Sequence, residues 1–258
     1  MAGVVGGQTA PDAFLEYFGP QRRSEVLRNV VVRHLWRLAW HARRAVRDGT
    51  AVLVTTPETE KLAVRMGAKR IAIVGADGIE PDLAPSAPPV RGERDHVRAL
   101  WLGRFLERKG LGLAVEAVER LPAESDVVLE VLGGAYNERN EREMQRYFAA
   151  PERSRRIVVS PREPYDEIGR VYERADIFVF TGIRVPVTEP AATVAALTDA
   201  IARLAASPEL RRSLGEAAFR RAREFTWDKK AAKVLAAMGC SEEPRPAPGD
   251  VPNQRGRG

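Results

Sequence analysis

Two cations that follow an apolar segment are the residues of this sequence best suited to bind a charged ligand. Residues 97–102 are mostly apolar and predict a buried strand, Gly103 ends it, and Gly110 opens a helical pattern. The end of a strand that leads into a helix is where open α/β sheets bind ligands. Arg104 can fork onto phosphate oxygens and Lys109 can add a point charge, so the pair suits a diphosphate. An ordinary strand-to-helix turn with two surface cations is the alternative, and the spacing alone favours neither.

The same stretch resembles a motif of a known enzyme family. Residues 103–110 read GRFLERKG, which is similar to the G-R-x-x-x-x-K-G motif of the family 4 glycosyltransferases, the retaining enzymes of the GT-B fold. In that family the arginine and the lysine hold the diphosphate of a nucleotide-sugar donor. The resemblance implies this role for Arg104 and Lys109, with Gly103 allowing the close approach of the ligand.

Short apolar segments alternate with helical patterns along most of the chain. Such alternation predicts parallel sheets covered by helices, the α/β class. Several segments also follow the order found in the family, among them DVVLEVLGG at 126–134, IFVF at 177–180 and SPELRRSLGEAAFRRAREFTW at 207–227. The resemblance implies a GT-B-like arrangement of two Rossmann-like domains, the first incomplete and the second with an internal deletion.

Composition and resemblance together divide the chain into four parts. Residues 1–80 are expected to form a partial N-terminal domain on the acceptor side, and residues 97–238 the C-terminal domain that binds the nucleotide sugar. Between them, residues 81–96 are rich in proline and charge and are interpreted as a linker. Residues 239–258 are interpreted as a disordered tail. In GT-B enzymes the helix that matches the one after Trp227 crosses back to the first domain, and we expect the same here.

A helix with a basic face is expected over residues 24–48. Leu27 and Val31 belong to its apolar side, and Trp36 and Trp40 lie one turn apart. A basic helix that carries tryptophans can lie on an anionic membrane, which would suit an acceptor linked to a lipid. The alternative is a solvated basic face with the tryptophans in the core. We expect the protein to be cytoplasmic, and the inner face of the membrane is a candidate contact.

Two further sets of residues are weaker candidates for binding. Gly6 and Gly7 belong to a glycine cluster that resembles an acceptor-side loop of some family members, and a plain turn is the simpler explanation of the cluster. Ser160, Pro161 and Arg162 follow another apolar segment, and we expect them to line the nucleotide base. Polar residues at strand ends are common, so the second assignment rests on position alone.

The family pattern is interrupted after the strand that ends at Phe180. Family members continue there with a glycine loop and a Glu-x7-Glu element that binds the donor sugar and the ribose. This chain passes from IFVFTG directly into IRVPVTEP, which resembles a later segment of the family. A unit of roughly thirty residues, the size of a βαβ unit, is therefore expected to be missing before Ile183. We do not assign the binding of the donor sugar and the ribose to Glu189, or to the pair Glu163 and Glu167.

The sequence predicts a glycosyltransferase-like protein that transfers a sugar from a nucleoside diphosphate sugar to an unidentified hydroxyl acceptor, without a metal or other cofactor. Catalytic residues are not assigned. The alternative is a non-catalytic or truncated remnant that binds nucleotide or a partner, because the donor-sugar element is missing. The net charge of +6 favours anionic partners, but no aromatic stacking pattern or nucleic-acid motif accompanies it, and no nucleic-acid partner is expected. One cysteine excludes an internal disulfide and a Cys-rich zinc site.

Overall fold

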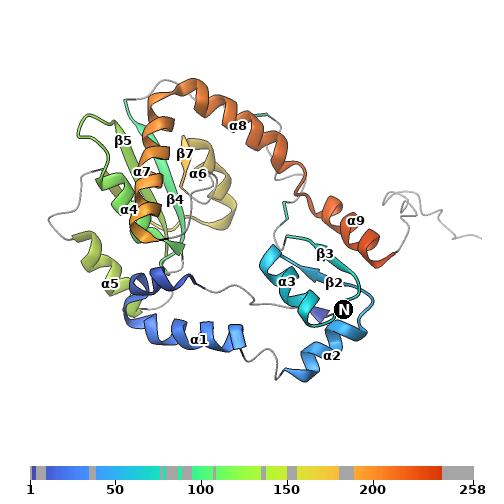
Figure 1. Ribbon diagram of the computed structural model, residues 1–258. Coiled ribbons are helices and arrows are strands. Elements are labelled where there is room, and N and C mark those ends of the chain that lie inside the picture. Colours follow the sequence, from blue (N-terminus) through green and yellow to red (C-terminus); the bar gives the residue numbers. More distant parts are fainter. Residues whose placement is uncertain are drawn as a thin grey trace, which may run out of the picture. The chain divides into compact units, whose positions relative to one another are not determined.

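The chain forms two compact units, each built on a parallel sheet (Figure 1). The first unit comprises Met1–Gly7, Arg37–Glu80 and Phe225–Gly258, and the second comprises Gln8–Trp36 and Pro81–Glu224. The structure is a computed structural model, and it describes residues 2–3, 10–34, 39–75, 78–79, 87–88, 95–106, 109–134, 138–149, 156–179 and 189–239.

The first unit contains a sheet of three strands in the order β1-β2-β3, all parallel. Its strands are β1 (Ala2–Gly3), β2 (Val52–Val54) and β3 (Ile71–Ile73). Its helices are α2 (Trp40–Asp48), α3 (Pro57–Arg65) and α9 (Trp227–Met238). The hydroxyl of Thr56 caps α3 by accepting the Thr59 amide at 3.2 Å, and proline occupies the first turn. A strand, a capped helix and a second strand in this order give the parallel β2–β3 pair.

The second unit contains a sheet of four parallel strands in the order β6-β5-β4-β7. Its strands are β4 (Val97–Arg104), β5 (Val127–Gly134), β6 (Ile157–Ser160) and β7 (Ile177–Phe178). Its helices are η1 (a 3-10 helix, Asp12–Gln21), α1 (Arg22–His34), α4 (Leu111–Glu119), α5 (Glu138–Ala149), η4 (3-10, Tyr165–Glu167), α6 (Ile168–Arg174), α7 (Pro190–Ala206) and α8 (Pro208–Ala222).

The core of the second unit lies on both faces of β4 and β5. On one face, Ala99 and Trp101 pack with the buried side of α4 and with Val194 of α7. On the other face, Leu100 packs with Val171 of α6. Burial on both faces explains why these strands are almost continuously apolar in sequence, as expected for a parallel sheet covered by helices. The prediction of an α/β fold with parallel sheets is confirmed.

The single helix expected over residues 24–48 is wrong. The described part of this stretch forms two helices, α1 and α2, and Ala39 before α2 has a non-helical ψ of 63°. The apolar side of α1 is exposed, with Leu27 at 64% and Val30 at 47%, and Trp40 is exposed as well, so the alternative with tryptophans in the core does not hold for Trp40. Apolar spacing predicts which residues share a face, but it marks neither a break that lacks glycine or proline nor the presence of a packing partner.

The expected domain boundaries and the compact units divide the chain differently. Gln8–Trp36 belongs to the unit that contains β4 and α4, although it was expected to belong to the N-terminal domain of residues 1–80. The helix after Trp227, α9, belongs to the first unit, as the GT-B resemblance implied. The expected tail lies outside the described residues except for Gly239, and most of the expected linker lies outside them as well.

Candidate functional site

The predicted diphosphate-binding residues lie at the carboxyl edge of the β6-β5-β4-β7 sheet. Because these strands are parallel, their carboxyl ends meet at one edge. Arg104 is the last residue of β4, is exposed, and pairs in register with Gly134 at the end of β5. Ser160 ends β6 and pairs with Leu132. Three strand ends therefore come together where α/β sheets commonly bind ligands.

Two glycines bring the ends of β4 and β5 unusually close together. A Cβ atom added to Gly133 would lie 1.8 Å from the carbonyl oxygen of Gly103. A Cβ atom on Gly103 would lie 3.2 Å from the ring of Trp101. A side chain at position 133 therefore requires the backbone to shift. Neither glycine covers its strand end with a side chain of its own.

Lys109 is held in place through its backbone. The Lys109 carbonyl oxygen accepts a hydrogen bond from the indole Nε1 of the buried Trp101 at 3.3 Å. The Lys109 amide donates to the carbonyl of Leu106 at 2.8 Å. Gly110 then adopts a left-handed conformation, with φ of 67°, as the N-cap of α4. These contacts place an exposed lysine directly before a helix N-terminus, whose partial positive charge favours anions.

Arg162 approaches the same edge from β6. Its Cδ atom lies 3.7 Å from the position that a Cβ atom of Gly134 would occupy, and its side chain is exposed. Gly134 therefore has the backbone of Arg104 in register on one side and the side chain of Arg162 on the other. Pro161, the residue before Arg162, is also exposed. The structure thus brings Gly103, Arg104 and Arg162 together around the end of β5.

Ser160 is engaged in a network that sequence reasoning missed. Its hydroxyl donates to Glu130 of β5 at 2.8 Å, and Arg174 of α6 donates to the same carboxylate oxygen at 2.6 Å. Glu163 lies 3.6 Å from Arg174. Burial opposes ionisation of Glu130, but the hydrogen bonds from Arg174 and Ser160 outweigh it and lower the pKa of this carboxyl below its ordinary value. The sequence signal that could have indicated this network is Glu130 itself, a glutamate inside an otherwise apolar strand.

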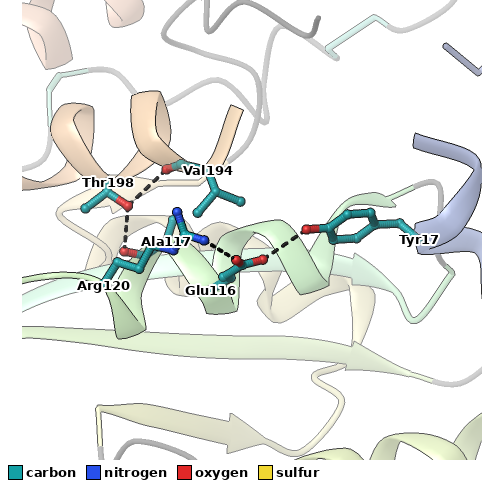
Figure 2. Close-up of polar contacts among 6 residues, drawn as sticks. All are labelled: Tyr17, Glu116, Ala117, Arg120, Val194 and Thr198. Carbon is teal, nitrogen blue, oxygen red and sulfur yellow. Dashed lines mark hydrogen bonds and ion pairs between the residues drawn. The ribbon is translucent and has the colours of Figure 1, made fainter. Parts of the chain in front are cut away.

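The first two turns of α4 are held by η1. Tyr17 donates to one carboxylate oxygen of Glu116 at 3.0 Å, and Arg120 donates to the other at 2.6 Å (Figure 2). A Cβ atom on Gly112 would lie 3.9 Å from the Tyr17 ring, so η1 lies against the beginning of α4. This contact joins residues 99 positions apart in the sequence.

The other side of α4 is fixed to α7. The hydroxyl of Thr198 lies 3.0 Å from the carbonyl oxygen of Ala117 and 2.9 Å from that of Val194, its own helix neighbour (Figure 2). Together with the buried contacts of Val194, this hydrogen bond fixes α7 along α4. The helix whose N-terminus follows Lys109 is therefore supported by both η1 and α7, so its end has a fixed position.

Some predicted residues lie outside the described part of the chain. These are Gly6 and Gly7 and the junction after the strand at 177–180, where the family pattern breaks. Among the described residues, no group of three or more His, Cys, Asp or Glu side chains is placed to hold a metal ion. Within those same ranges, no helix combines the length and the apolar character that a membrane span requires.

Comparisons with known proteins identify the segment that carries this site. Residues 91–195 match the family model described as glycosyl transferases group 1. This segment includes all of the described candidates, Gly103, Arg104, Lys109 and Ser160–Arg162. The comparison with curated proteins gives no match.

Solved structures of glycosyltransferases resemble most of the chain. A glycosyltransferase from Rickettsia africae ESF-5 has a TM-score of 0.58 at 13% identity, over 90% of this chain and 67% of that chain. Anabaena Alr3699/HepE, in complex with UDP and glucose, has a TM-score of 0.57 at 11% identity, over 79% of this chain and 66% of its own. S. aureus TarM, in a complex that includes UDP and alpha-GlcNAc-glycerol, has a TM-score of 0.54 at 11% identity, over 78% of this chain and 46% of its own.

These similarities establish the fold. The chain has the GT-B fold of glycosyltransferases, as the resemblance of its motifs implied. It spans about half the length of TarM and about two thirds of HepE.

Proposed function

We propose that this chain is a glycosyltransferase-like protein that binds a nucleoside diphosphate sugar and transfers its sugar to a hydroxyl acceptor. The observation that carries the proposal is the position of Arg104, Lys109 and Arg162 around the carboxyl edge of one parallel sheet, inside the segment that matches the family model. The structures of HepE and TarM contain UDP, which supports a uridine nucleotide as the first donor to test.

Each part of the edge has a distinct role in this proposal. The glycines at the ends of β4 and β5 let phosphate oxygens approach the backbone. Arg104 binds the diphosphate through its planar fork, and Lys109 adds a positive charge at the N-terminus of α4. When the bond between sugar and phosphate breaks, negative charge develops on the leaving diphosphate. Cations already in place stabilise that charge without reorganisation, so the reaction needs no cofactor. By resemblance to family 4 the transfer retains the anomeric configuration.

The test is calorimetric titration of the purified chain with UDP. Arg104→Ala is expected to weaken binding about tenfold or more, because a charge-assisted bidentate contact is lost. Lys109→Ala should weaken it less, since a lysine offers a single point charge. Arg212→Ala, which removes an exposed arginine of α8, is the matched control and should bind like the unaltered chain. Unaltered affinity in both Arg104→Ala and Lys109→Ala would refute the proposed donor site.

A second candidate function is nucleotide binding without transfer. It is favoured by the edge of the sheet next to the site, where β7 has only two residues and Phe178 is 39% exposed. The sequence break follows directly, at the point where the family carries its donor-sugar glutamates. A chain that binds UDP but neither hydrolyses UDP-glucose nor transfers glucose to any hydroxyl acceptor would support this alternative.

Peripheral contact with an anionic membrane is part of the first proposal, since a lipid-linked acceptor would lie there. Four apolar side chains of α1, Val26, Leu27, Val30 and Val31, are exposed, and arginines begin the same helix. Leu27→Ser combined with Val31→Ser should reduce co-sedimentation with phosphatidylglycerol vesicles at least threefold. Equal co-sedimentation with neutral phosphatidylcholine vesicles would exclude an electrostatic membrane contact.

A further inference from the structure

The guanidinium of Arg174 connects an inner strand of the second sheet with the loop that follows β6. Arg174 ends α6, donates to the Glu130 carboxylate at 2.6 Å and lies 3.6 Å from the Glu163 carboxylate. The Glu130 side chain is 15% exposed and that of Arg174 is 33% exposed, so solvent screens their pair less than it screens a pair at the open surface. Arg174 therefore ties the loop to a strand inside the sheet.

The buried side of α6 determines where Arg174 lies over the sheet. Val171 is 1% exposed and packs in one cluster with Leu100 and Leu132. Residues three apart lie on the same side of a helix, so Arg174 follows Val171 toward the sheet. Glu130 projects from the sheet face of Leu132, because alternate residues of a strand point to the same side. The ion pair between Arg174 and Glu130 thus follows from the packing of α6.

The same network anchors residues 160–163 on two sides. On the strand side, Ser160 donates to Glu130 at 2.8 Å, and it shares its acceptor oxygen with Arg174. On the loop side, the Glu163 carboxylate lies near the same guanidinium. The two residues between these anchors are both exposed to solvent. A short segment that is held before and after its exposed residues has a defined position before any ligand binds.

The two exposed residues, Pro161 and Arg162, lie beside the end of β5. The Cδ atom of Arg162 is 3.7 Å from the position of a Cβ atom on Gly134. A proline ring and a planar guanidinium both present flat surfaces, which suit the face of a nucleotide base. A binding segment that is already ordered loses less entropy when its ligand binds. The contribution of Pro161 and Arg162 to affinity should therefore depend on the network that holds them.

We propose that Arg174 is a positioning residue for the nucleoside part of the donor. It acts through Ser160 and Glu163, which hold Pro161 and Arg162 in place, and not through a contact of its own with the donor. This inference rests on the proposed function, in which the diphosphate binds at Arg104 and Lys109.

The test compares two ligands that differ in the nucleoside, UDP and inorganic pyrophosphate. Arg174→Met keeps a long side chain but removes both contacts with carboxylates. Calorimetric titration should show that this variant binds UDP about fivefold more weakly, because the nucleoside segment must become ordered on binding. Its affinity for pyrophosphate should stay unaltered, because the diphosphate residues are retained. A merely structural role would weaken both ligands alike, and that result, or unaltered binding of both, would overturn the proposal.

Two further variants and a matched control sharpen this result. Glu163→Gln removes the charge of the loop-side anchor alone and should weaken UDP binding about twofold. Arg174→Lys keeps one charge without the planar fork, so its affinity for UDP should lie between those of Arg174→Met and the unaltered chain. Arg170→Met is the control on the same helix, since Arg170 is 78% exposed and pairs at 2.8 Å with Glu167. It should bind both ligands as the unaltered chain does. If Arg174→Met does not fold, unaltered UDP binding by Glu163→Gln and Arg174→Lys overturns the proposal.

The same titrations separate this inference from the proposed function. An unaltered chain that binds neither ligand would refute the donor site and the positioning role together. Equal affinity of the unaltered chain for UDP and pyrophosphate would leave the diphosphate site standing and refute the positioning role alone, because no nucleoside contact would then contribute to binding.

Discussion

The two sheets of this protein differ in where they leave polar groups accessible. In the second unit, β4 and β5 are paired along eight residues each, and helices cover both faces, so binding groups lie at the strand ends. In the first unit, β3 has three residues, and α9 lies along its outer side with Lys230 donating to the Gly75 carbonyl. Strand ends combined with cations suit a compact anion. A short strand with a helix along its outer side leaves less of its backbone to a ligand.

The largest expected effect tests the close approach of β4 and β5. Gly133→Ala places a Cβ atom 1.8 Å from the Gly103 carbonyl oxygen and should lower the free energy of unfolding by about 3 kcal/mol. Urea denaturation followed by circular dichroism measures it. The matched control is Gly169→Ala in α6, where no atom lies within 4 Å of the added Cβ. Gly169→Ala should be neutral or stabilising by up to about 0.5 kcal/mol. Equal stability of the two variants would contradict the close approach.

A smaller effect tests how the first unit holds α9 against its sheet. Lys230 is 7% exposed, its Nζ donates to the Gly75 carbonyl at 2.8 Å, and it lies 5.7 Å from the centre of the Trp227 ring. Lys230→Met keeps the length of the side chain but removes the hydrogen bond and the cation–π contact. We expect a loss of about 1–2 kcal/mol in thermal or urea unfolding.

The neighbouring Lys229→Met is the control for this effect. Lys229 is exposed on the same helix, so its replacement should change the free energy of unfolding by less than about 0.5 kcal/mol. If the two methionine variants are equally stable, the buried lysine does not hold α9 in place.

The smallest effect concerns pH and the Glu130 network. The pKa of Glu130 is lowered in the folded chain, so its ion pair stabilises the fold above the titration range of an unfolded glutamate, about pH 4.3. The contribution is lost as the pH falls through the lower, folded pKa. It should stay below about 1 kcal/mol, because solvent screens the pair. The free energy of unfolding in urea should therefore decrease less between pH 7 and pH 3 for Glu130→Gln than for the unaltered chain. If the two chains lose the same free energy over this pH range, the network does not contribute.

The strongest sequence predictions rested on local signals. The apolar run before Gly103 predicted β4, and the spacing of Arg104 and Lys109 matched a motif whose segment the family model covers. The cap formed by Thr56 is equally local, because capping depends on a side chain and an amide three residues apart. In each case the residues that determine the structure lie within a few positions of one another.

The features that were missed depend on residues far apart in the chain. The contact of Tyr17 with Glu116 spans 99 positions, and that of Glu130 with Arg174 spans 44. Neither pair has a local pattern that marks it. Whether the apolar side of α1 is buried was left open for the same reason, since burial of an apolar face requires a partner that periodicity does not identify. The use of Ser160 as a partner of Glu130 likewise follows from the strand register, which sequence reasoning left open.

The hydrogen bond from Trp101 to the Lys109 carbonyl gives the protein a built-in optical reporter. Trp101 is 2% exposed, whereas Trp40 is 60% and Trp227 is 44% exposed. In a Trp36→Phe variant, acrylamide or iodide should therefore quench the emission of those exposed indoles and leave a blue-shifted signal from Trp101. The Trp101 indole donates a hydrogen bond to the carbonyl of Lys109. A nucleotide that moves Lys109 would therefore alter this residual fluorescence. Donor binding could then be followed without a label, through a residue that does not itself contact the ligand in the proposed site.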